Sequence, residues 1–134
     1  MTDNCTLPAG MIVLASAHSV MDTIARLETL LREKNVLIFA RIDFSGDALR
    51  AGLELRPEQM LIFGNPQGGT PLMAQKPSVG LDLPLKALVW QDGDGKTWLG
   101  YNDPNYIVQR HGVDAALQKN LAAVIPLLES AVRT

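Results

Sequence analysis

The stretch from Met60 to Leu85 constrains the fold of this chain more than any other, because strand, turn and helix signals follow one another closely there. It reads MLIFGNPQGGTPLMAQKPSVGLDLPL. The apolar run at 60–63 predicts a strand that ends at Gly64. A tight loop is expected next, and then a helix that begins at Thr70-Pro71, since a threonine cap followed by proline favours a helix start. A binding site is most strongly expected in this stretch.

Composition narrows the class of protein. The chain has 134 residues, of which 47% are hydrophobic and 19% charged, so a single domain over 1–134 with a lead-in at 1–10 is expected. Its net charge of -2, with the signs interspersed, argues against nucleic acid as a partner. The apolar run at 11–17 is too short to cross a membrane. Cys5 is the single cysteine, so no intramolecular disulfide can form and a cytoplasmic location is expected.

The first third of the chain predicts a strand, a helix and a second strand. The apolar run at 11–16 indicates the first strand. Ser19 is a favoured N-cap, and the apolar residues after it recur at helical spacing, which predicts a helix that stops near Asn35. The stretch 36–44 alternates as a strand does. One face is expected to carry Val36, Ile38, Ala40, Ile42 and Phe44, and the other Leu37, Phe39, Arg41 and Asp43.

The rest of the chain adds strands and short helices. The pieces 53–56 and 60–63 flank Pro57, which predicts either two strands or one strand with a bulge. The stretches 84–91 and 96–102 predict an antiparallel hairpin around Asp92-Gly93-Asp94-Gly95. Helices are expected at 104–110 and 115–132, the second interrupted at Pro126. These elements predict an α+β domain with about five strands.

Several motifs together resemble the domain of unknown function 302 family and follow its order over nearly the whole chain. The resemblance implies a two-layer α+β domain, a mostly antiparallel sheet with helices packed on it, that is commonly a dimer. It implies no established reaction. Many relatives have histidine where this chain has Phe44, so any chemistry of that histidine is absent here. The motifs are FARIDF at 39–44, GLELRP at 52–57, LIFGNPQGGTPLM at 61–73, LDLPLKALVWQDGDGKTWLGYNDP at 81–104 and RHG at 110–112.

The first candidate site is the loop between the strand at 60–63 and the helix expected at Thr70. Free amides of Gly69, Thr70 and the first helical turn would point at a small anion, and Gly68 and Gly69 would let it approach the backbone. The loop begins at Asn65 and lacks the lysine of a nucleotide-binding loop. The alternative is an ordinary turn with an ordinary helix cap.

The second candidate is a polar network around the second strand. Arg41 and Asp43 are two residues apart and share a face, from which they could reach Asn65 or Asp82. Such a network would either bind a polar ligand or act as a structural ion pair, and structural pairs also shift pKa values.

Other chemistry is poorly represented. His18 and His111 lie near helix ends, and neither sits beside a serine in a nucleophile-elbow context, so no catalytic residue is assigned. Clustered ligands for a metal are absent from the sequence pattern, and no cofactor is expected. His111 is expected to stabilise the end of its helix. Trp90 and Trp98 are expected either to pair across the hairpin or to anchor an interface.

Three functions therefore stay open. The first is a homodimeric ligand-binding or accessory module whose cleft would combine Arg41, Asp43 and Asn65 with the helix start at 68–70. The second is a hydrolase or isomerase that uses Asp43 or Asp82 as general base. The third is a structural or protein-interaction domain without a small-molecule site.

Overall fold

A computed structural model describes residues 7–134 of the chain. Cys5 and most of the expected lead-in lie outside the described residues. Five strands form one sheet in the order β1-β5-β4-β3-β2, and each neighbouring pair is antiparallel. The α+β class and the mostly antiparallel sheet are therefore confirmed. The strands are β1 (Met11–Ser16), β2 (Leu37–Asp43), β3 (Glu58–Gly64), β4 (Leu85–Gln91) and β5 (Thr97–Asn102).

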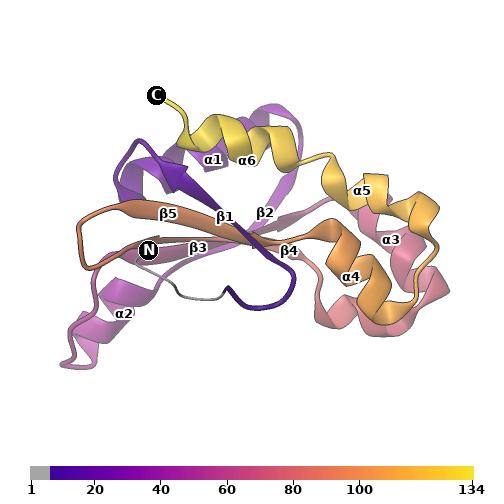
Figure 1. The fold of residues 1–134 in the computed structure, drawn as a ribbon, viewed down its shortest axis with the longest axis horizontal. Helices are drawn as coiled ribbons and strands as arrows, with labels where there is room; N and C mark the ends of the chain where they lie inside the picture. The colour runs from indigo at the N-terminus through magenta and orange to yellow at the C-terminus, as the bar shows by residue number, and fades with distance from the viewer. Residues whose placement is uncertain (1–6) are drawn as a thin grey trace.

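Two helices cover one face of this sheet, as Figure 1 shows. The helix α1 (Val20–Glu33) lies against β2, β3 and β4, while α6 (Ile125–Val132) lies against α1 and β1. Ser19 caps α1 as predicted, because its hydroxyl accepts a hydrogen bond from the amide of Asp22. The main core lies between these helices and the sheet. Its side chains include Ile24, Leu27, Leu31, Leu61, Phe63, Val89, Leu99 and Leu128, each at most 1% exposed.

The other helices gather at one end of the sheet, on the right in Figure 1. They are α3 (Pro66–Gln75), the short 3-10 helix η1 (Pro77–Leu81), α4 (Pro104–His111), η2 (Ala115–Leu117) and α5 (Gln118–Ala122). Asp103 caps α4, and Pro126 lies in the first turn of α6, so the last helical segment is interrupted as predicted. A second core cluster holds this end together. It consists of Leu72, Val79, Ile107, Val108, Val113 and Leu121.

The opposite face of the sheet, which we call the open face, carries apolar side chains that are only half-buried. The helix α2 (Phe44–Arg50) lies at one end of the sheet in Figure 1. Trp90 and Trp98 lie directly opposite each other on β4 and β5, which is one of the two alternatives expected for them from the sequence. The half-buried apolar residues of the open face include Met11, Val13, Ile42, Met60, Ile62, Leu88, Trp90 and Trp98.

Two strand predictions were inexact. The residues Leu53–Arg56 form no strand, so β3 alone follows α2. The register of β2 against β3 shifts between Ile38 and Ala40. Ile38 therefore pairs with Phe63 on the covered face, whereas Ala40 pairs with Ile62 on the open face. The prediction that Ile38 and Ala40 share a face was wrong, because a bulge inserts one residue between them.

Candidate functional site

The helix α3 begins five residues earlier than the sequence predicted. Asn65, and not Thr70, is the N-cap: its side-chain oxygen accepts from the amide of Gln67, and Pro66 occupies the first helical position. The amides of Gly68 and Gly69 both donate to the carbonyl of Asn65. Thr70 therefore lies inside the helix. The expected loop at 65–69 is a helical turn, and its glycine amides are already hydrogen-bonded.

A groove opens between this helix, the start of β4 and the chain around α5. Its volume is about 260 Å³. Four of the predicted site residues, Asn65, Gly68, Gly69 and Thr70, lie along it. The other lining residues are mostly apolar: Val36, Phe39, Gly64, Pro66, Met73, Leu83, Pro84, Leu85, Asn120, Leu121 and Val124. The structure thus brings most of the first candidate site together, but around an apolar space.

Two partly exposed apolar side chains form part of the groove wall. Phe39 is 53% exposed and Met73 is 38% exposed. Phe39 is the residue inserted by the β2 bulge, and its ring lies next to the backbone of Gly64. Bulges commonly re-aim a side chain in this way. Simple alternation predicts that Phe39 shares a face with Leu37, so its place in the groove is not evident from the sequence.

The charge of the groove does not favour an anion. Its lining contains no lysine, arginine or histidine. Asn65 and Asn120 are polar members of the wall, and the side-chain amide of Asn120 donates to the carbonyl of Gly68 at 3.2 Å. Without a cation or free amides, an anion would lose hydration and gain little in return. A mostly apolar molecule suits these walls better.

Arg41 and Asp43 do not line the groove. Arg41 bonds to Gln59 at 3.2 Å and to Glu28 of α1 at 3.4 Å. Asp43 caps α2, where it accepts from the amide of Gly46 and the hydroxyl of Ser45. These two hydrogen bonds lower the pKa of Asp43 below its usual value, and Arg50 and Arg41 add to that effect. Asp43 therefore serves as a helix cap, and it is a weak general base.

Asp82 belongs to a third, separate cluster. Its carboxylate accepts from Arg110 at 2.9 and 3.0 Å and lies 2.6 Å from Nε2 of His111. Burial raises the pKa of Asp82, but the hydrogen bond with His111 and the charge of Arg110 outweigh burial and lower it overall. The other ring nitrogen of His111, Nδ1, lies 2.8 Å from the hydroxyl of Ser78. Ser78 lies on η1, Asp82 follows η1, and Arg110 and His111 lie at the end of α4, so no local sequence signal connects them.

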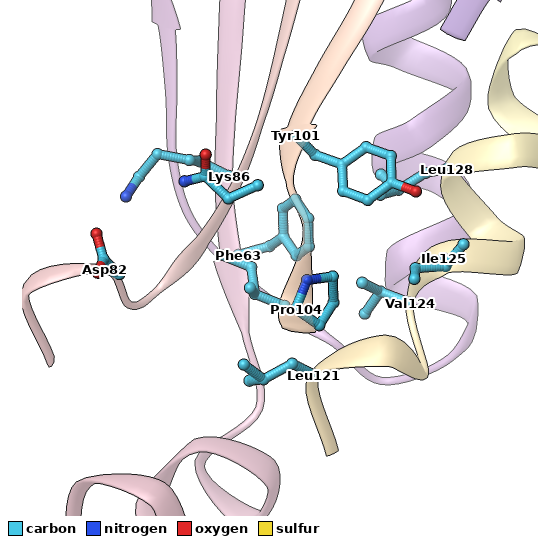
Figure 2. Close-up of a pocket in the computed structure, with 11 residues that line it drawn as sticks. Phe63, Asp82, Lys86, Tyr101, Pro104, Leu121, Val124, Ile125 and Leu128 are labelled. Carbon is cyan, nitrogen blue, oxygen red and sulfur yellow. The ribbon is translucent and has the colours of Figure 1, made fainter. Parts of the chain in front are cut away.

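A much smaller cavity lies beneath the groove, between the sheet and the junction of α5 and α6. Figure 2 shows Phe63, Leu121 and Val124 around it, with Asp82 and Lys86 to one side. Its volume is about 10 Å³, which is space for one water molecule at most. It shares Leu85, Leu121 and Val124 with the groove, so these side chains separate the two spaces.

Residues 7–134 hold no group of three or more His, Cys, Asp and Glu side chains placed to bind a metal ion. None of the helices in this range combines the length and the apolar character that a bilayer crossing needs.

The chain is similar to parts of longer proteins. Over 119 residues it is 41% identical to "Fluoride-specific ion channel FluC 1" of Brucella suis biovar 1. The matched region covers 89% of this chain and 47% of that protein. It is also 41% identical over 119 residues to "Fluoride-specific ion channel FluC 2" of Brucella melitensis biotype 1, with 89% of this chain and 44% of that protein covered. The chain thus spans about half the length of the curated relatives it matches.

A solved structure shares the fold. The crystal structure of an uncharacterized conserved protein DUF302 from Bacillus stearothermophilus superposes with a TM-score of 0.75 at 24% sequence identity, over 93% of this chain and 97% of that one. The family model described as domain of unknown function DUF302 matches residues 12–131, and that family has no assigned reaction. The motifs, the sheet and this match agree: the chain belongs to the DUF302 family.

Proposed function

We propose that the protein is a small-ligand-binding accessory module and that the groove beside α3 is its binding site. The observation that carries this proposal is the groove itself: about 260 Å³, apolar, and lined by a helix start whose glycines leave room for a ligand. Ligand sites are commonly concave and apolar with a few polar groups. An apolar cavity of about 150 Å³ can hold benzene, so a somewhat larger molecule suits this space.

The ligand class follows from the walls. Phe39, Met73 and Leu83 offer apolar contact, while Asn65 and Asn120 offer neutral hydrogen-bonding groups at the side of α3. We therefore propose a short apolar molecule with an uncharged polar end in place of the small anion that the sequence suggested. Burial of apolar surface would supply most of the binding free energy.

The accessory role is supported by the lengths of the relatives. The matched region makes up 47% and 44% of the two Brucella proteins. In those proteins a domain of this kind therefore shares a chain with a second part of similar length. We propose that this chain likewise supports another protein's activity and performs no reaction in the groove.

Ligand binding can be tested on untagged protein by native mass spectrometry, followed by melting curves with decanol and decanoate. The proposal predicts extra mass on the protein or a rise in Tm, larger with decanol than with decanoate, because a ligand that binds only the folded state stabilises it. Gly69→Leu should abolish the shift. A side chain at 69 would contact Leu83 and Met73, which both line the groove.

Ala74→Leu is the matched control for Gly69→Leu. Ala74 is exposed on the same helix and does not line the groove, so this variant should bind as the wild type does. If no extra mass appears and neither compound raises Tm, the groove is not a ligand site. In that case the structural or protein-interaction function gains weight.

We also propose that the protein is a homodimer that pairs through the open face. The support is a continuous set of half-buried apolar side chains on a sheet face that α1 and α6 do not cover. Face-to-face packing of two such sheets is a common way to bury them. Ile62→Lys should give a folded monomer in native mass spectrometry, whereas Met21→Lys, at an exposed position of the helix α1 on the other side of the sheet, should leave the dimer intact. A wild-type monomer would contradict the dimer.

The general-base alternative has less support. A strong general base has a pKa close to the working pH, but the pKa values of both Asp43 and Asp82 are lowered. The single-domain organisation and the cytoplasmic location stay predictions that rest on composition and on the single cysteine.

A further inference from the structure

Outside the groove, three side chains form a hydrogen-bonded chain of nucleophile, base and acid. The hydroxyl of Ser78 lies 2.8 Å from Nδ1 of His111, and Nε2 of His111 lies 2.6 Å from a carboxylate oxygen of Asp82. In sequence, Ser78 and His111 are 33 residues apart. The packing of η1 against α4 brings them together.

The surroundings of the three side chains suit different roles. The side chain of His111 is 8% exposed and that of Asp82 is 17% exposed, whereas Ser78 is open to solvent. Arg110 holds the carboxylate of Asp82 through both of its oxygens. The imidazole is thus fixed from one side, and the hydroxyl is the member of the chain that an outside molecule can reach.

We propose that Ser78 is a nucleophile that cleaves small esters, with His111 as its general base and Asp82 and Arg110 as positioning residues. This activity is separate from ligand binding in the groove. The orientation fits: when Nε2–H of His111 donates to Asp82, Nδ1 keeps a lone pair and accepts the proton of Ser78. The two ring nitrogens exchange the roles that they have in most serine hydrolases, and the order of donors and acceptors is unchanged.

The reaction balances with water as the second reactant. The oxygen of Ser78 attacks the ester carbonyl carbon while its proton moves to Nδ1 of His111. The C–O bond to the alcohol breaks, and the alcohol leaves with that proton. Water then attacks the acyl-serine, gives its proton to Nδ1, and the acid leaves as the proton returns to the oxygen of Ser78. No oxidation or reduction takes place.

The neighbourhood of Ser78 favours an apolar acyl group. Side chains three residues apart are eclipsed in a 3-10 helix, so Leu81 lies on the same side of η1 as Ser78. Leu81 is 74% exposed and offers an apolar contact beside the hydroxyl. We therefore expect p-nitrophenyl butyrate to be a better substrate than p-nitrophenyl acetate.

The test uses a fluorophosphonate probe, which reacts with activated serines, on the whole chain. Intact-mass spectrometry should show one adduct, and peptide mapping should place it on Ser78. Ser78→Ala should remove the adduct and the hydrolysis of p-nitrophenyl butyrate. His111→Asn should slow labelling about 100-fold or more, since Asn cannot accept the proton.

Ser45→Ala is the matched control. The hydroxyl of Ser45 donates to the carboxylate of Asp43 in place of a histidine ring. This variant should label and hydrolyse as the wild type does. If wild-type Ser78 labels no faster than Ser45, the proposal is overturned and the cluster only ties η1 to α4. Because this result comes from the wild type, it does not depend on how well the variants fold, and it leaves ligand binding in the groove untouched.

Discussion

The two faces of the sheet differ in how the same strand pattern is used. On the covered face, Leu61 and Phe63 of β3 are at most 1% exposed beneath α1. On the open face, Met60 and Ile62 of the same strand are half-buried. Alternation places these two pairs of side chains on opposite sides of the strand, but it does not tell which side the helices cover. A strand pattern predicts which side chains share a face of the sheet. The packing of the helices decides how deeply each face is buried, and therefore how much it contributes to the free energy of unfolding.

The largest effect is expected from the covered face. Leu61→Ala should lower the free energy of unfolding by about 2–5 kcal/mol, because it removes transfer energy and leaves a cavity in a packed core. Ile62→Ala, one residue along, should cost clearly less in the monomer, since Ile62 is only half-buried. Urea denaturation of both variants measures the difference. Equal losses in a monomeric protein would mean that the two faces are equally buried in solution.

The next effect tests the best-packed part of the open face. A Cβ atom on Gly100 would lie 2.5 Å from the terminal methyl of Met11 and 3.0 Å from Cζ3 of Trp90. Gly100→Val should therefore cost about 1–3 kcal/mol through overpacking and should change the fluorescence of Trp90. Gly95→Ala is not a suitable control, because Gly95 has a φ of 82°, at which an alanine would strain the backbone. Ala15 is exposed near the end of β1, so Ala15→Val is a better control and should leave the free energy of unfolding nearly unchanged.

Sequence signals succeeded where the structure is local. Ser19, the hairpin around Asp92 and the interruption at Pro126 each depend on neighbours in the chain. Two cap-and-proline signals, Asn65-Pro66 and Thr70-Pro71, lie five residues apart, and local chemistry does not choose between them. The contact of Gly68 with Asn120 and the burial of Leu72 favour the earlier start.

The rest of the candidate site depends on tertiary contacts. The bulge that turns Phe39 into the groove comes from the register of β2 against β3, which no residue of β2 reveals by itself. Likewise, the sequence suggested Asp82 as a possible partner of Arg41 and Asp43, but its actual partners lie 28 and 29 residues away on α4. The residue types indicated which side chains could take part in a polar site. Only the packing of η1 on α4 showed which of these side chains are in contact.

A smaller effect is expected at the hairpin end of the open face, where Asp92 fixes Trp98. The indole N–H of Trp98 donates to Asp92 at 2.9 Å, and this bond, with those from the amides of Lys96 and Asp94, lowers the pKa of Asp92 below its usual 3.8. A carboxylate whose pKa is lower in the folded state than in the unfolded state stabilises the fold above about pH 4. This stabilisation is lost as the pH falls toward the pKa of the folded state. Asp92→Asn should flatten this loss in acid denaturation followed by tryptophan fluorescence. An unchanged acid profile would contradict the role of Asp92.

The smallest effect is expected on the outer surface of α1, which faces solvent and neither side of the sheet. Arg32 pairs with Glu28 at 2.8 Å, one helical turn away, and its side chain is 62% exposed. Solvent screening limits such a pair, so Arg32→Ala should cost about 0.3–0.5 kcal/mol and less in high salt. Glu28→Gln should cost more, because Glu28 also accepts from Arg41 on the covered side of β2. A double-mutant cycle by urea denaturation separates the contributions of the two ion pairs. A loss above about 1 kcal/mol for Arg32→Ala would show that the outer side of α1 is not simply solvent-exposed but packs against another surface.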